Sequence, residues 1–304
     1  MTHPIMHPEA KPPVFARHDH PKFAEQETST ESSYEGLGRR SSLDGPRSRL
    51  SLVRTASSSG LLVVLIHGDS GCASQWAEVQ SCLAPHRPTL ALDLRGHGAS
   101  GPASDGDYSY AGRADDVVAA ADACGLGRFL LVAHSGGAGV ALAVGAACPG
   151  RVAGLLMIDP ATDPAVLPRE VRDRFLADLT GPHGLDALKA YYASIAGTDP
   201  SLRDRVLRDA EAVHPDARLG TARALAAWDP KAALAAAPVP IRIVATGITD
   251  GPAALWRLPG DLPLDLPTEV IPGTGHWLQI ERPDLVSERV EDFAAEMESA
   301  APGP

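Results

Sequence analysis

Residues 130–138 read LLVAHSGGA, an apolar run that reaches Ser135 and continues into a stretch of small residues. A buried strand that turns directly into a helix forces the residue at the corner into strained backbone angles. Such a corner needs small residues two positions to either side, and here they are Ala133 and Gly137. The stretch therefore predicts a strand, a sharp turn and a helix, with Ser135 at the turn as a candidate nucleophile.

The first small residue departs from the usual form of this turn, which is Gly-x-Ser-x-Gly. Ala133 adds one methyl group where the strand and the helix crowd each other. A buried Ser-Gly-Gly turn that simply leads into a helix is the alternative interpretation, because short motifs recur by chance. The rest of the sequence has to decide between the two.

Short apolar runs of the kind that are buried on both faces of a sheet recur along the chain. They cover residues 61–66, 89–92, 129–132, 155–158, 241–245 and 269–271. Helical patterns lie between most of them, and the clearest are residues 111–125 and the segment that begins at Pro283. Residues 38–43 and 49–55 alternate in polarity around a turn and predict an edge hairpin. This order of elements predicts an α/β fold, in which a mostly parallel central sheet carries helices on both faces.

Residues 162–231 interrupt the alternation, because their pattern is helical throughout. An all-helical insertion between two strands predicts a cap. We therefore expect a core formed by residues 36–161 and 232–304, with the cap at 162–231. Residues 1–35 are rich in His, Pro, Glu, Ser and Thr and carry little apolar periodicity, so they predict a disordered N-terminal extension.

The composition is that of a soluble globular protein, with 304 residues, 44% of them hydrophobic and 21% charged. A formal net charge of −11 argues against a nucleic-acid surface, which needs clustered Lys and Arg. No run approaches the roughly 20 apolar residues that cross a bilayer, and the first residues lack the pattern of a secretory signal. We expect a cytoplasmic protein that binds neither nucleic acid nor membranes, and a homodimer remains open.

The four cysteines carry no metal or redox signature. Their spacings match neither a zinc site nor a C-x-x-C pair, and they are Cys72, Cys82, Cys124 and Cys148. We therefore expect reduced, partly buried cysteines and no metal site.

Polar residues follow the predicted strands at their carboxyl ends, where open parallel sheets bind their ligands. Ser135 is one of them, and His276 follows the last predicted strand. A serine hydroxyl is a poor nucleophile at neutral pH, so it needs an imidazole to take its proton. His276 can do this, provided that a carboxylate orients its other ring nitrogen.

Two acids compete for that position. Asp250 lies in a short loop with Gly247 after the predicted strand 241–245, and this loop matches the expected acid turn. Asp159 directly follows strand 155–158, where Asp-Pro can also simply end a strand. We favour Asp250 and keep Asp159 as the alternative acid.

Five segments together resemble the alpha/beta-hydrolase superfamily, in its serine-nucleophile branch with a helical cap. They read LIHGDSG, LDLRGHGAS, VAHSGG, ATGITD and GTGHWLQIERPD, and the resemblance covers about residues 36–297. The resemblance implies that Ser135 is the nucleophile, Asp250 the acid and His276 the base. It also implies acyl chemistry through an acyl-enzyme that water resolves, with no cofactor.

The developing oxyanion needs two backbone donors. The resemblance places them at the N–H groups of Asp69 and Gly136. A carboxylate beside a developing negative charge would hinder the reaction, so we expect the Asp69 side chain to be an exposed loop acid. The alternative is that it binds a polar group of the substrate.

Aromatic residues near the predicted mouth indicate a mainly apolar small-molecule substrate with one reacting carbonyl. The candidates are Trp76, Tyr191, Trp228 and Trp277, and core packing is an equally good explanation for them. His134 precedes the nucleophile and should point away from it, because adjacent residues of a strand face opposite sides. We nevertheless include His134 among the substrate-binding candidates.

The function expected from these residues is a serine hydrolase that cleaves an ester, thioester or lactone of a mainly apolar small molecule. A C–C bond hydrolase or an acyltransferase would use the same three residues. A non-catalytic receptor for a small ligand could also use this fold, because fold alone does not guarantee chemistry. The sequence leaves these alternatives open.

Overall fold

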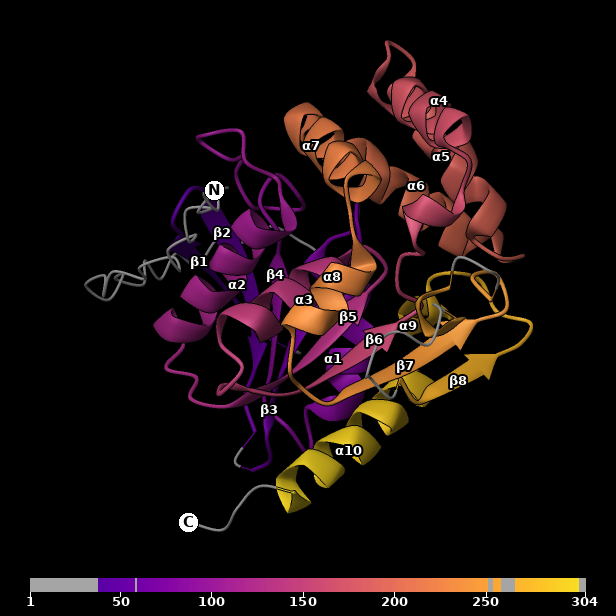
Figure 1. Ribbon diagram of the computed structural model, residues 1–304. Helices are drawn as coiled ribbons and strands as arrows, with labels where there is room; N and C mark the ends of the chain where they lie inside the picture. Colours follow the sequence, from indigo (N-terminus) through magenta and orange to yellow (C-terminus); the bar gives the residue numbers. More distant parts are fainter. Residues whose placement is uncertain (1–37, 58, 251–253, 258–265, 301–304) are drawn as a thin grey trace, which may run out of the picture.

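The computed structural model describes residues 38–57, 59–250, 254–257 and 266–300. The predicted extension, residues 1–35, lies outside the described residues. At the centre is an eight-stranded sheet with the order β1-β2-β4-β3-β5-β6-β7-β8 (Figure 1). Its strands are β1 (Arg39–Asp44), β2 (Arg49–Thr55), β3 (Leu62–Ile66), β4 (Thr89–Asp93), β5 (Phe129–His134), β6 (Val152–Ile158), β7 (Ile241–Thr246) and β8 (Thr268–Ile271).

The sheet is parallel from β4 to β8, and β2 runs antiparallel to both of its neighbours, β1 and β4. This confirms both the predicted parallel sheet and the predicted edge hairpin. Every residue of β5 and β6 is buried, as their uninterrupted apolar sequences predict. Because parallel strands end at the same edge, residues that follow β5, β6, β7 and β8 meet there.

Helices cover both faces of the sheet, each over its own apolar cluster. Figure 1 shows α2 (Tyr110–Ala123), α3 (Gly137–Ala147) and α8 (Pro230–Ala236) on the near face. The other face packs against α1 (Ala77–Leu83) and α10 (Pro283–Ser299). Ser109 begins α2 by accepting a hydrogen bond from the N–H of Gly112, and Gly125 follows its end with φ +67°. The predicted α/β fold is confirmed.

Between β6 and β7 the chain forms helices only. After a short 3-10 turn at Pro164–Val166 come α4 (Arg169–Thr180), α5 (Gly184–Ile195), α6 (Pro200–Ala212) and α7 (Pro215–Ala226). We call these four helices the cap, which stands beyond the carboxyl ends of the strands (Figure 1). The cap has an apolar cluster of its own, built on Leu179, Leu188, Leu202 and Val206. The next helix, α8, packs on the core instead.

None of the helices that the structure describes combines the length and the apolar composition that a membrane-spanning segment needs.

Candidate active site

Ser135 stands at the corner between β5 and α3. Its φ is +51°, in the left-handed region that non-glycine residues rarely adopt, and its N–H donates to the carbonyl of Ile158 at 3.1 Å. Space at this corner is tight, because a Cβ on Gly137 would lie 2.5 Å from the carbonyl oxygen of His67. Ala133 is accommodated as a fully buried residue of β5. The predicted strand, turn and helix are confirmed.

His276 links Ser135 to a carboxylate. It lies between β8 and the short helix α9 (Leu278–Glu281), and its Nε2 is 2.9 Å from the Ser135 hydroxyl oxygen. Its Nδ1 is 2.5 Å from Oδ2 of Asp159. With the ring proton on Nδ1, the imidazole donates to Asp159 and is free to accept the serine proton at Nε2.

Asp159 is fully buried at the end of β6, with φ +42°. The N–H and hydroxyl of Thr246 donate to its carboxylate at 2.7 and 3.0 Å, and the Thr249 hydroxyl donates to Oδ1. Burial alone would raise the pKa of Asp159. The hydrogen bond and charge of His276, together with the donors from the β7 loop, outweigh burial and leave this pKa below its usual value. The carboxylate therefore stays ionised beside the imidazole.

The preference for Asp250 as the acid is corrected by this geometry. Its carboxylate pairs with Arg257 at 2.6 Å, while Asp159 occupies the ring nitrogen of His276. The physical reason is the strand order: β6 lies directly beside β5, and β7 is one strand further away. The loop after β7 contributes Thr246 and Thr249 as donors to the acid. Neither threonine was assigned a role from the sequence, although both lie within the segment ATGITD.

The two candidate oxyanion donors lie on either side of Ser135. Gly68 approaches so closely that a Cβ on it would lie 2.9 Å from the Ser135 Cβ. Gly136 directly precedes α3. Within the described part of the chain, neither the N–H of Asp69 nor that of Gly136 donates to a protein acceptor. Both groups are therefore available to a ligand, and their role stays a prediction.

His67 fixes the loop that carries Asp69. Its Nε2 accepts from the N–H of Leu94 at 3.0 Å, and its Nδ1 donates to the carbonyl of Gly68 at 2.8 Å. Burial lowers the pKa of His67 to about 4, so the ring stays neutral and keeps both bonds.

The expectation that Asp69 is an exposed loop acid is wrong. Its side chain is only 15% exposed, and its Oδ1 pairs at 2.7 Å with Nη1 of Arg113, which is fully buried on α2. Its carbonyl accepts from the Tyr192 hydroxyl of α5 at 2.7 Å. The sequence did not reveal these contacts, because Arg113 and Tyr192 lie 44 and 123 residues from Asp69 along the chain. Contacts over such separations leave no periodic pattern in a sequence.

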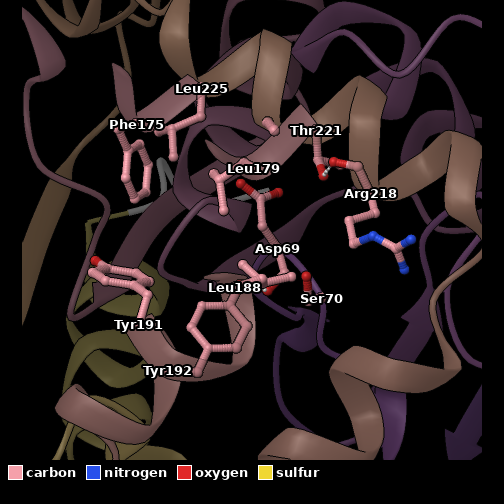
Figure 2. Close-up of a pocket in the computed structure, with 11 residues that line it drawn as sticks. Asp69, Ser70, Phe175, Leu179, Leu188, Tyr191, Tyr192, Arg218, Thr221 and Leu225 are labelled. Atoms are coloured by element: carbon pink, nitrogen blue, oxygen red, sulfur yellow. Dashed lines mark hydrogen bonds between the residues drawn. The ribbon is translucent and has the colours of Figure 1, made fainter. Parts of the chain in front are cut away.

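A pocket lies between the cap and the loop that carries Asp69 and Ser70 (Figure 2). Apolar side chains from α4, α5 and α7 form most of its wall, and Asp69 and Ser70 stand at its core side. Ser135 is half-buried just beyond these two residues and is not itself part of the pocket wall. The wall includes Phe175, Leu179, Leu188, Tyr191 and Leu225.

The predicted binding residues divide between this pocket and the core. Tyr191 lines the pocket. Trp76 is fully buried against the back of the sheet, and Trp228 packs on Tyr110 with ring centres 5.5 Å apart. Trp277 packs between the cap and His276. Core packing, the alternative kept for these aromatics, thus describes all three tryptophans.

The structure does not place His134, one of the substrate-binding candidates, in the pocket wall. It is fully buried, and its Nε2 donates to the carbonyl of His276 at 2.9 Å. Burial lowers the pKa of His134 to about 3, which keeps the ring neutral. The residue therefore supports the loop of His276 and does not contact the pocket.

Known proteins share this architecture. The model of the alpha/beta hydrolase family matches residues 63–289. The chain is 29% identical over 260 residues to a putative carbamate hydrolase of Variovorax paradoxus, covering 80% of this chain and 94% of that protein. It is 27% identical to an acetyltransferase component of the acetoin cleaving system of Pseudomonas putida, covering 77% of this chain and spanning 63% of that protein's length.

A solved structure described as the N-acyl homoserine lactone degrading enzyme Est816 superposes with a TM-score of 0.72 at 23% identity. The superposition covers 83% of this chain and 99% of that one. At this identity the likeness speaks for the fold. The family model, in contrast, spans most of the sequence, from within β3 to within α10. This chain is therefore a member of the alpha/beta hydrolase family.

Proposed function

We propose that the protein is a serine hydrolase that cleaves an ester, thioester or lactone of a mainly apolar small molecule. The observation that carries the proposal is the continuous hydrogen-bonded chain from the Ser135 hydroxyl through His276 to Asp159. This arrangement supplies a nucleophile, a base and an orienting carboxylate within one buried site.

The first half of the reaction forms an acyl-enzyme. Ser135 Oγ attacks the substrate carbonyl while His276 Nε2 takes its proton, and the carbonyl electron pair moves onto oxygen. The N–H groups of Asp69 and Gly136 stabilise that oxyanion. Collapse of the intermediate expels the alcohol or thiol, which receives its proton from the imidazolium.

The second half releases the acid. Water attacks the acyl-enzyme, His276 takes a proton from it, and the second collapse returns that proton to Ser135. Asp159 stabilises the imidazolium in both halves and remains ionised throughout. These steps need no cofactor, because each proton has an acceptor among the three side chains.

The pocket supports a substrate with a mainly apolar body. Leucine and aromatic side chains of the cap form most of its wall, and its polar side chains come from the loop of Asp69 and Ser70 and from α7. A small molecule bound there would place its apolar part under the cap and its carbonyl toward the sheet edge.

Hydrolysis of p-nitrophenyl butyrate tests the proposal. We expect a burst of p-nitrophenol followed by steady turnover, and a loss of at least about 10³-fold in kcat for Ser135→Ala. The exposed Ser104 offers a matched control, because Ser104→Ala deletes the same hydroxyl far from the triad. Equal rates for the two variants would refute Ser135 as the nucleophile. Ligand binding without release of p-nitrophenol would favour a receptor.

A further inference from the structure

The carboxylate of Asp69 occupies an unexpected place for a hydrolase of this kind. A Cβ added to Gly136 would lie only 2.3 Å from Oδ2 of Asp69. The carboxylate therefore packs directly against the residue whose N–H is one of the two candidate oxyanion donors. Figure 2 shows it among the side chains that line the pocket, next to Leu179 and Leu188 in that view.

Arg113 holds this carboxylate in place. The guanidinium of Arg113 is fully buried and donates to Oδ1 of Asp69 at 2.7 Å. The positive charge on α2 therefore balances the negative charge of the carboxylate. An ion pair buried this deeply is costly to break, because either partner alone would be an unpaired charge. The position of Asp69 is thus built into the core and does not depend on a ligand.

The other oxygen of Asp69 has no such partner. Among the described residues, no N–H or O–H donates to Oδ2. The Tyr192 hydroxyl, which is near, donates to the Asp69 carbonyl, and the Thr221 hydroxyl donates to carbonyls of its own helix. Oδ2 is not among the buried atoms that lack a partner, so solvent or a ligand can reach it. Oδ2 therefore presents an open acceptor to the pocket, beside the place where the scissile carbonyl would bind.

We propose that Asp69 is a specificity-determining residue that selects substrates carrying an O–H or N–H on the carbon next to the scissile carbonyl. This inference rests on the proposed function, since it takes the carbonyl oxygen to bind at Gly136. We also take the acyl part of the substrate to lie on the side of Oδ2, so the substituent nearest to Oδ2 is the one on the adjacent carbon. The substrate class is thus an ester or lactone with a neutral α-hydroxyl or α-amide group.

Electrostatic repulsion explains why Asp69 would favour substrates that carry a donor. A substrate without a donor would bring the growing negative charge of its carbonyl oxygen close to Oδ2, and the repulsion would slow the attack. A donor that binds Oδ2 removes part of that repulsion and adds a charge-assisted hydrogen bond. A substrate carboxylate at the same carbon would meet Oδ2 as a like charge and bind poorly.

Two phenyl esters of nearly equal shape test the proposal. Phenyl 2-hydroxypropanoate carries the α-hydroxyl, and phenyl 2-methylpropanoate carries a methyl in its place. Each rate is divided by the rate of uncatalysed hydrolysis, which removes the difference in intrinsic reactivity. We expect wild type to prefer the better enantiomer of the hydroxy ester about tenfold or more in kcat/KM, as a hydrogen bond to a charged group predicts.

Asp69→Asn should reduce this preference at least about fivefold, because the amide keeps the shape and loses the charge. The ratio for two substrates in one preparation does not depend on how much of the variant is folded, so loss of folded protein cannot imitate the result. Arg218→Gln is the matched control: it removes a charge from the pocket wall without touching Asp69, and the preference should persist. An unchanged ratio in Asp69→Asn, or equal rates for the two esters in wild type, would overturn the proposal.

Binding separates this inference from the proposed function. Ser135→Ala cannot form the acyl-enzyme, so both esters can be titrated into it as ligands. Tighter binding of the hydroxy ester, lost in Ser135→Ala/Asp69→Asn, supports the role of Asp69 even if wild type turns over neither ester. Equal affinities in Ser135→Ala refute it even if wild type is an active esterase.

Discussion

The ends of β6 and β7 each carry an aspartate, and the two are used differently. Asp159 follows β6, has no exposed surface and accepts hydrogen bonds from Thr246, Thr249 and His276. Asp250 lies four residues beyond β7, is an exposed residue with a side chain 27% exposed, and pairs with Arg257. The difference teaches that a buried acid needs donors from a second loop. The β7 loop provides that support and does not provide the acid.

The strongest test of this difference is to replace each of the two aspartates by asparagine in turn. Asp159→Asn should lower kcat/KM for p-nitrophenyl butyrate by about 10³ to 10⁴-fold, because the amide favours the wrong tautomer of His276. Asp250→Asn changes a carboxylate that His276 does not touch, and we expect a change of less than about threefold, as for other exposed ion pairs. A large loss in Asp250→Asn together with a small one in Asp159→Asn would reverse the assignment.

The pH dependence of kcat/KM tests the proton acceptor. His276 accepts the serine proton only as a neutral ring, so we expect kcat/KM to fall as the pH is lowered. A wild-type profile that is flat from pH 5 to 8 would contradict His276 as the base.

Thr249→Val tests whether the loop after β7 supports the carboxylate of Asp159. It removes one hydroxyl donor from Asp159 while keeping the size and branching of the side chain. We expect kcat/KM to fall about tenfold, the cost of one hydrogen bond to a charged group. Thr268→Val, at the start of β8, deletes a hydroxyl that bonds only a nearby carbonyl, and it should have little effect. Equal losses in the two variants would remove the special role of Thr249.

The last expected effect is on stability. The pKa of Asp159 is lowered in the folded state, so its contribution is present above its unfolded pKa of about 3.9 and is lost as the pH falls through the folded pKa. Asp159→Asn should therefore unfold more easily than wild type at pH 7, by about 1 to 3 kcal/mol. Urea unfolding at pH 7 and pH 3 measures this difference, which should shrink at pH 3. A constant difference at both pH values would contradict the lowered pKa.

The sequence predicted the sheet and the corner at Ser135 well, because both leave local signals. Buried strands are continuous apolar runs, and the corner needs small residues at fixed spacing. His276 was found for a similar reason, since its glycine-rich loop follows the last strand.

What the sequence did not reveal depends on the order of strands across the sheet and on contacts between distant segments. Asp159 and Asp250 both follow strands, and only the position of β6 between β5 and β7 decides which one His276 meets. The pair of Asp69 and Arg113 joins a loop to a helix. The tryptophans fit a pocket and a core equally well from composition alone, because both environments are apolar.

The attachment of His276 to the cap has a consequence for the position of its ring. The N–H of His276 donates to the carbonyl of Ile195 at the end of α5, and a Cβ on Gly275 would lie 2.8 Å from the backbone of Ala196. Movement of this end of α5 would break that hydrogen bond and disturb the segment that holds the imidazole beside Ser135. The cap therefore contributes to the position of the imidazole as well as to the wall of the pocket.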